Sequence, residues 1–162
     1  MTPEWQGAYE AGIFTEFMEQ RGPGHTVGSV KIYEKGFLDY KDDIQKSLDS
    51  LDFMNDTEAL DKKNELEGMK LACDAIMILG ERYAAYAREL AEKETDPKRK
   101  EELLQIAANC DVVPAHKPQT YWQALQMYWF VHMGVTTELN PWDAYSPGRL
   151  DQHLNPFYER DV

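Results

Sequence analysis

Cysteine is scarce in this sequence, and its two copies lie far apart. Cys73 and Cys110 belong to no Cys-x-x-Cys pair and to no cluster with histidine, so neither a disulfide framework nor a zinc site is expected. Cys73 lies within Leu71-Ala-Cys-Asp-Ala-Ile76 and is predicted to be a small buried core residue. A glycine-rich phosphate loop, a Gly-x-Ser-x-Gly elbow and a His-Glu-x-x-His motif are also absent. The common signatures of nucleotide-binding proteins, serine hydrolases and zinc proteases are therefore excluded.

Long apolar runs and basic residues are lacking as well. No stretch approaches the length of a membrane span, and residues 1–5 carry neither the basic nor the apolar region of a secretory signal. The 17 Lys and Arg against 29 Asp and Glu give a formal net charge of −12 and a pI near 4.7. Such a surface repels phosphate backbones and anionic lipids, which argues against nucleic acid or membrane as the main partner. We expect a cytoplasmic protein.

What the sequence does contain is helical periodicity. From Phe37 to Leu51, apolar residues recur every three or four positions and predict a helix. Asn55-Asp-Thr57 can cap a second helix at roughly 58–94, and Asp96-Pro97 marks the start of a third that ends near residue 110. At about 1.5 Å per residue, the second helix would be on the order of 50 Å long. A helix of that length normally packs against a larger body.

The last third of the chain combines an aromatic helix with segments of strand composition. Thr120 and Gln123 predict a capping box, followed by a helix over 120–133 that is apolar nearly all round and should be buried on most sides. The composition of Val135–Leu139 and Leu150–Tyr158 favours short strands, and Thr26–Tyr33 reads as an extended segment or a loop. The predicted fold class is mainly α, with two or three short strands that have no partners within the chain.

Two loops carry candidate catalytic groups. His25 follows Gly22-Pro-Gly24, so its imidazole is presented on a loop and can exchange protons near neutral pH. Asp143 follows Trp142 in a loop bounded by prolines, where partial desolvation favours the protonated carboxyl and suits acid–base work. The local alternatives are a histidine that binds a carbonyl and an aspartate that caps a turn. His132 is interpreted as a satisfied core histidine, and no spacing supports a metal site.

Arg149 and Asp151 are separated by one residue. On a strand, both side chains would point to the same face, since successive side chains alternate between faces. We interpret them as a structural ion pair or polar pair rather than as catalytic groups.

Four segments resemble the glycyl radical enzymes, the family of pyruvate formate-lyase, and they occur in the same order. They are Arg21-Gly-Pro-Gly-His-Thr26, Val113-Pro-Ala-His116, Tyr121–His132 and Gly148-Arg-Leu-Asp-Gln152. The resemblance covers essentially all 162 residues, and the last two segments are specific for the family. It implies that the chain is a helical portion of the pyruvate formate-lyase-like ten-stranded β/α barrel.

Within the family, Gly24-His-Thr and Asn140-x-Trp-Asp-Ala are most similar to the branch that removes water from trans-4-hydroxy-L-proline. This similarity implies that His25 and Asp143 contact the departing C4 hydroxyl and assist its loss as water. It also implies that Phe17 packs on the substrate ring. The parent enzyme would be an anaerobic homodimer whose glycyl radical is installed by a radical-SAM activating enzyme.

The sequence departs from the family where the radical is handled. Neither the glycyl radical motif nor the Cys-x-Glu motif occurs, because Cys73 is followed by Asp74-Ala75 and Cys110 by Asp111-Val112. Family members are several times longer. We therefore expect residues 1–162 to be a partial pyruvate formate-lyase-like domain, an N-terminal-region fragment that is inactive alone and binds no cofactor.

Two alternatives stay open. The chain could come from another family member, namely a glycerol or diol dehydratase, a C–C lyase or a formate acetyltransferase. It could also be a short helical interaction module that binds a partner through the apolar helix 120–133.

Overall fold

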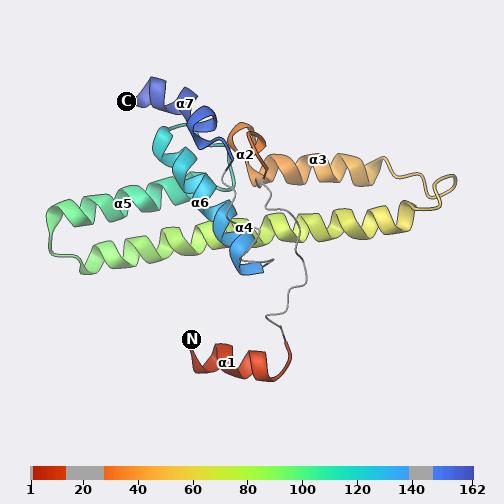
Figure 1. Cartoon of the computed structure of the whole chain (residues 1–162), viewed down its shortest axis with the longest axis horizontal. Coiled ribbons are helices and arrows are strands. Elements are labelled where there is room, and N and C mark those ends of the chain that lie inside the picture. Colours follow the sequence, from red (N-terminus) through yellow and green to blue (C-terminus); the bar gives the residue numbers. More distant parts are fainter. Residues whose placement is uncertain (1, 14–27, 139–147) are drawn as a thin grey trace.

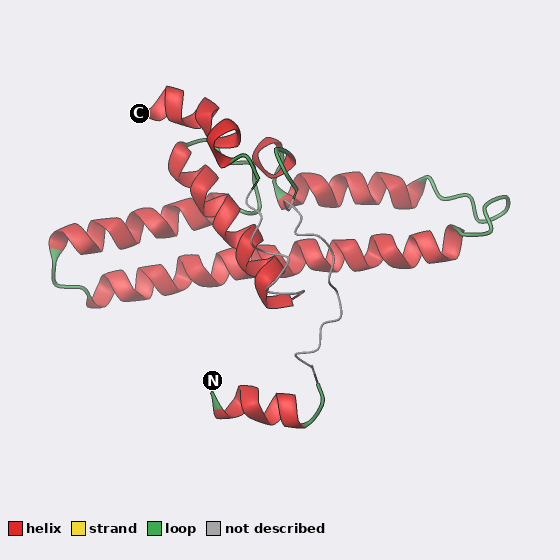
Figure 2. Ribbon diagram, in the orientation of Figure 1, coloured by secondary structure: helices red, strands yellow, loops and turns green. Residues whose placement is uncertain are grey.

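The described part of the chain is entirely helical (Figure 2). A computed structural model describes residues 2–13, 28–138 and 148–162. The helices are α1 (Pro3–Glu10), α2 (Lys31–Glu34), α3 (Phe37–Asp49), α4 (Ala59–Lys93), α5 (Pro97–Val112), α6 (Tyr121–Glu138) and α7 (Leu150–Asp161). The prediction of a mainly α fold is confirmed. None of the described helices combines the length and the apolar character needed to cross a membrane.

The long helix α4 is the base on which the other helices lie (Figure 1). α3 runs alongside one end of α4 and α5 runs alongside the other, so that two antiparallel helix pairs share one long partner. α6 crosses α4 near its middle, and α7 and α2 pack at the amino-terminal end of α6. The core lies under this crossing, where Val113, Ala124, Met127 and Phe130 are completely buried.

Capping residues explain why three of these helices begin where the sequence predicts. Asp96 accepts a hydrogen bond from the Lys98 backbone N–H at 3.1 Å, and Pro97 opens α5. Thr120 Oγ1 accepts from the Gln123 N–H at 3.1 Å, whereas Gln123 Oε1 accepts from the Gln119 N–H at 2.9 Å rather than from Thr120. The predicted capping box at α6 is therefore half formed, with its second bond shifted by one residue.

The predicted strands are wrong wherever the structure describes them. Lys31–Glu34 forms α2, Val135 continues α6, and Leu150–Tyr158 lies in α7. In α6 the β-branched Thr137 is accommodated because its hydroxyl donates to the Met133 carbonyl at 2.8 Å. Local strand composition was a poor guide because tertiary packing outweighs β-propensity.

In α7, packing also outweighs Pro156, which stands inside the helix. Leu150, Leu154 and Phe157 recur at helical spacing and pack together against the core. Because this segment is a helix, Arg149 and Asp151 do not form the predicted same-face pair. Arg149 is instead the residue before the helix, and its guanidinium donates to Gln152 Oε1 at 3.5 Å.

The connection from α5 to α6 passes tightly between α3 and α4, and we call its residues 113–116 the crossing segment. A Cβ added at Gly36 would lie 2.2 Å from the Ala115 carbonyl oxygen, and one added at Gly80 would lie 2.5 Å from Pro114 Cδ. The backbone N–H groups of Phe37 and Leu38 donate to the Pro114 and Ala115 carbonyls at 3.0 and 3.1 Å. Two glycines and two hydrogen bonds thus hold the crossing segment in place.

Gly80→Ala should destabilise the chain although alanine is the better helix former. The new methyl group meets the buried Pro114 ring, and overpacking of this kind lowers the free energy of unfolding by about 1–3 kcal/mol. Gly68→Ala on the same helix is the matched control, since nothing lies within 4 Å of its added Cβ. It should raise the free energy of unfolding by about 0.5–1 kcal/mol. Urea denaturation measures both, and equal effects at the two positions would contradict the tight crossing.

Candidate functional site

The three residues expected to contact a substrate lie outside the described part of the chain. Phe17 and His25 fall in residues 14–27, and Asp143 falls in residues 139–147. Their roles stay predictions. The structure does show where these two segments join the helical body. Residues 14–27 lead through Gly28 to α2, and residues 139–147 connect α6 to Gly148 and α7.

Both segments join the body at one cluster of aromatic side chains, which we call the α2–α7 junction (Tyr33, His153 and Phe157). The buried Tyr33 ring lies 5.8 Å from the His153 ring and 6.1 Å from the Phe157 ring, measured between centroids. Gly28 and Gly148, with φ of 68° and 70°, turn the chain into this junction in a conformation that favours glycine. The junction therefore anchors the carboxyl ends of both candidate loops close together.

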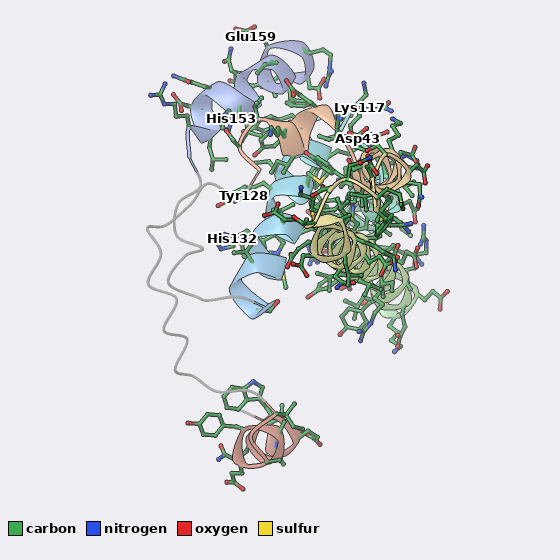
Figure 3. All side chains as sticks on the ribbon, turned by 90° about the vertical axis from the view of Figure 1, so that its right-hand side faces the viewer. Asp43, Lys117, Tyr128, His132, His153 and Glu159 are labelled. Carbon is green, nitrogen blue, oxygen red and sulfur yellow. The ribbon has the colours of Figure 1, made fainter. Side chains whose placement is uncertain are left out.

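Neutral polar groups gather beside the junction. Burial raises the pKa of Tyr33 to about 12, with a further contribution from Tyr128, and burial also raises the pKa of Tyr128. Both phenols are protonated at neutral pH and can donate or accept a hydrogen bond. Tyr128, His132 and His153 lie on the side of α6 and α7 that faces away from α3 and α4 (Figure 3). This side thus offers phenol and imidazole groups for binding a polar molecule or transferring a proton.

His132 differs from the sequence-based interpretation. It is half-buried rather than a core residue, and its ring stacks on the rings of Tyr128 and Trp129 at centroid distances of 5.6 and 5.7 Å. Tyr33 and Tyr128 did not attract attention in the sequence, because a tyrosine among apolar residues is an ordinary core residue. The only available signal was that Tyr33 follows closely after the loop that carries His25.

An open groove of about 640 Å³ lies between α4 and α6. Its lining residues are apolar except for one threonine: Phe37, Leu71, Ala72, Ala75, Ile76, Leu79, Val131, Gly134, Val135 and Thr137. A charged ligand would leave its charges without partners there, at a cost of several kcal/mol. The groove therefore suits apolar packing and not a zwitterionic amino acid.

A second open cavity, of about 520 Å³, is lined by charged side chains of α3 and of the connection before α6. Asp43 is paired with Lys35 and, at 3.2 Å, with Lys46, so its carboxylate is already neutralised (Figure 3 labels Asp43). The pKa of Asp43 is lowered by its hydrogen bond from Lys35, which keeps it ionised. Among the described residues, no group of three or more His, Cys, Asp or Glu side chains could hold a metal ion.

Both cysteines are buried within the helical body. Cys73 lies on the inner face of α4, as predicted, and Cys110 lies on α5. Burial raises the pKa of both thiols, that of Cys110 to about 11. Neither cysteine can therefore act as an exposed thiolate.

Known proteins of similar sequence and fold were found. The profile of the pyruvate formate lyase-like family matches residues 1–162. Trans-4-hydroxy-L-proline dehydratase of Clostridioides difficile is 70% identical over 162 residues, which are 100% of this chain and 20% of that protein. The prediction of a glycyl radical enzyme resemblance, with a hydroxyproline dehydratase among its relatives, is confirmed.

Solved structures agree. Hydroxyproline dehydratase from Clostridioides difficile, crystallised with trans-4-hydroxy-L-proline bound, matches with a TM-score of 0.84 at 70% identity, over 100% of this chain and 20% of that chain. The B12-independent glycerol dehydratase of Clostridium butyricum, with glycerol bound, matches with a TM-score of 0.81 at 29% identity, over 99% of this chain and 20% of that chain. The chain thus spans about one fifth of the length of the relatives it matches.

The cysteine environments predict slow alkylation. With its pKa near 11, on the order of one Cys110 thiol in a thousand is ionised at pH 8, and the reaction should become appreciable only at higher pH. Iodoacetamide at pH 8, followed by mass spectrometry, should label neither cysteine in the folded chain and both in urea. Ser47→Cys, at an exposed position of α3, is the control that should label in the folded chain. Rapid labelling of Cys73 or Cys110 would contradict their burial.

Proposed function

This chain belongs to the pyruvate formate lyase-like family of glycyl radical enzymes, and on that premise we propose that it forms part of the substrate pocket of a dehydratase acting on trans-4-hydroxy-L-proline. The observation that carries the proposal is the 70% identity to the hydroxyproline dehydratase over the whole chain, against 29% for the glycerol dehydratase of similar fold. Residues 1–162 would be a partial domain of an enzyme about five times longer, in line with the 20% of the relative that they match.

In this proposal, His25 and Asp143 hydrogen-bond the C4 hydroxyl of hydroxyproline and assist its departure as water. Hydroxide is a poor leaving group, so a proton has to reach the oxygen as the C–O bond breaks, and a desolvated carboxyl or an imidazole can supply it. Phe17 packs on the pyrrolidine ring. The α2–α7 junction supports this arrangement, because His25 and Asp143 are joined to Gly28 and Gly148 by connections of a few residues, each about 3.5 Å long.

The radical part of the reaction would be supplied by portions of the enzyme outside these residues. Cys73 and Cys110 do not fit the family's Cys-x-Glu cysteine, because both are buried and neither is followed by the required glutamate. The proposal includes activation by a radical-SAM enzyme, a homodimeric parent, and an anaerobic cytoplasm. This chain contributes binding and proton transfer, and it holds no cofactor of its own.

Asp143→Asn tests the proposed proton donor. We suggest a full-length chimera in which this chain replaces the matching residues of the Clostridioides difficile enzyme. Turnover of hydroxyproline should fall by about 100-fold or more, the usual contribution of a general acid, because an amide cannot protonate the leaving hydroxyl. The glycyl radical signal in electron paramagnetic resonance should be unchanged.

Asp61→Asn is the matched control, since Asp61 is an exposed carboxylate in the first turn of α4, and its turnover should equal that of the parent chimera. Unchanged turnover in the Asp143→Asn variant would remove Asp143 from the site. Turnover of glycerol or propanediol in place of hydroxyproline would support a diol dehydratase instead.

A further inference from the structure

One face of α6 is apolar and exposed. Trp122, Leu125 and Trp129 are 47%, 38% and 52% exposed, and their spacing of three and four residues places them in a single row, which we call the outer stripe. The opposite face of the same helix carries Met127 and Phe130, which are completely buried in the core. α6 is therefore a helix with one covered and one uncovered apolar face.

Charge is missing from this region as well. No Asp, Glu, Lys or Arg occurs from Pro118 to Thr137, although 28% of the chain consists of these residues. The outer face of a surface helix normally carries charged or polar side chains. Tryptophan at the centre and charge at the margin is instead the composition of a buried interface. Single exposed apolar residues elsewhere, such as Met54 and Leu60 among acidic and basic neighbours, need no such explanation.

We propose that the outer stripe is an internal interface, covered by the remaining four fifths of the same enzyme. The relatives that share this fold continue for about four times the length of this chain, so a large body is available to cover it. A narrow stripe suffices for such packing, since a covalent connection supplies a high effective concentration of the partner. The inference rests on the proposed membership of a longer enzyme, and not on the substrate or on His25 and Asp143.

A second copy of this chain fits the stripe less well. A stable dimer interface buries on the order of 20–30 residues on each side, far more than the row of Trp122, Leu125 and Trp129. Two copies would also bring together surfaces that each belong to a chain with a net charge of −12, which opposes association.

Oxidative footprinting of the full-length chimera measures the coverage directly. Hydroxyl radicals label exposed side chains, and mass spectrometry compares the rate for each residue in native and in urea-unfolded protein. Trp122 and Trp129 should be protected about ten-fold or more in the native chimera, as expected of side chains removed from water. Met54, which is 90% exposed here, should be labelled at nearly its unfolded rate.

Paired substitutions give a second measurement. Trp122→Gln with Trp129→Gln should lower the melting temperature of the chimera by several degrees, because both tryptophans then leave polar groups in an apolar contact. Met54→Gln with Leu60→Gln is the matched control and should leave the melting temperature unchanged, since these residues are exposed.

Labelling of both tryptophans at nearly their unfolded rates would overturn the inference. Protection that disappears when a dimeric chimera is diluted to monomers would also overturn it, and would assign the stripe to a second copy. Asp143→Asn should leave the protection intact even where it abolishes turnover. Failure of the substrate assignment and failure of the interface are thereby distinguished.

Discussion

The arrangement of the helices depends on the close approach between the crossing segment and the two helices that enclose it. Gly36 and Gly80 leave room for Ala115 and Pro114, and the first turn of α3 donates two N–H groups to their carbonyls. These bonds satisfy donors that the start of a helix leaves without intrahelical partners. Because the crossing segment leads directly into α6, its position determines where α6 begins and which face of α6 is buried against α4.

The sequence predicted the elements whose ends carry chemical signals. Asp96 and Pro97 marked α5, and apolar periodicity marked α3 and α4, because caps and periodic burial act locally. It failed at Lys31–Glu34, Val135 and Leu150–Tyr158, where β-branched residues and Pro156 suggested extended chain. Those segments become helical through contacts with distant residues, such as Tyr33 against Phe157, which no local pattern contains.

The site was predictable only in part. His25 and Asp143 could be identified from their loops and from the family resemblance, and they lie outside the described residues. The α2–α7 junction could not be foreseen, because it brings Tyr33 beside His153 from opposite ends of the chain. A rigid helical body that anchors two loops at one place is a common way to position catalytic groups, since loops carry function when a scaffold holds their ends. The buried cysteines and the apolar groove agree with a scaffold role for the remaining helices.

The most direct test is a crystal structure of the full-length chimera with trans-4-hydroxy-L-proline bound, prepared without the radical so that the substrate persists. The account predicts that the C4 hydroxyl oxygen lies within hydrogen-bond distance, about 3 Å, of both the His25 imidazole and the Asp143 carboxyl. It also predicts that Phe17 contacts the pyrrolidine ring. Hydroxyproline bound with its C4 hydroxyl remote from both residues would contradict the account.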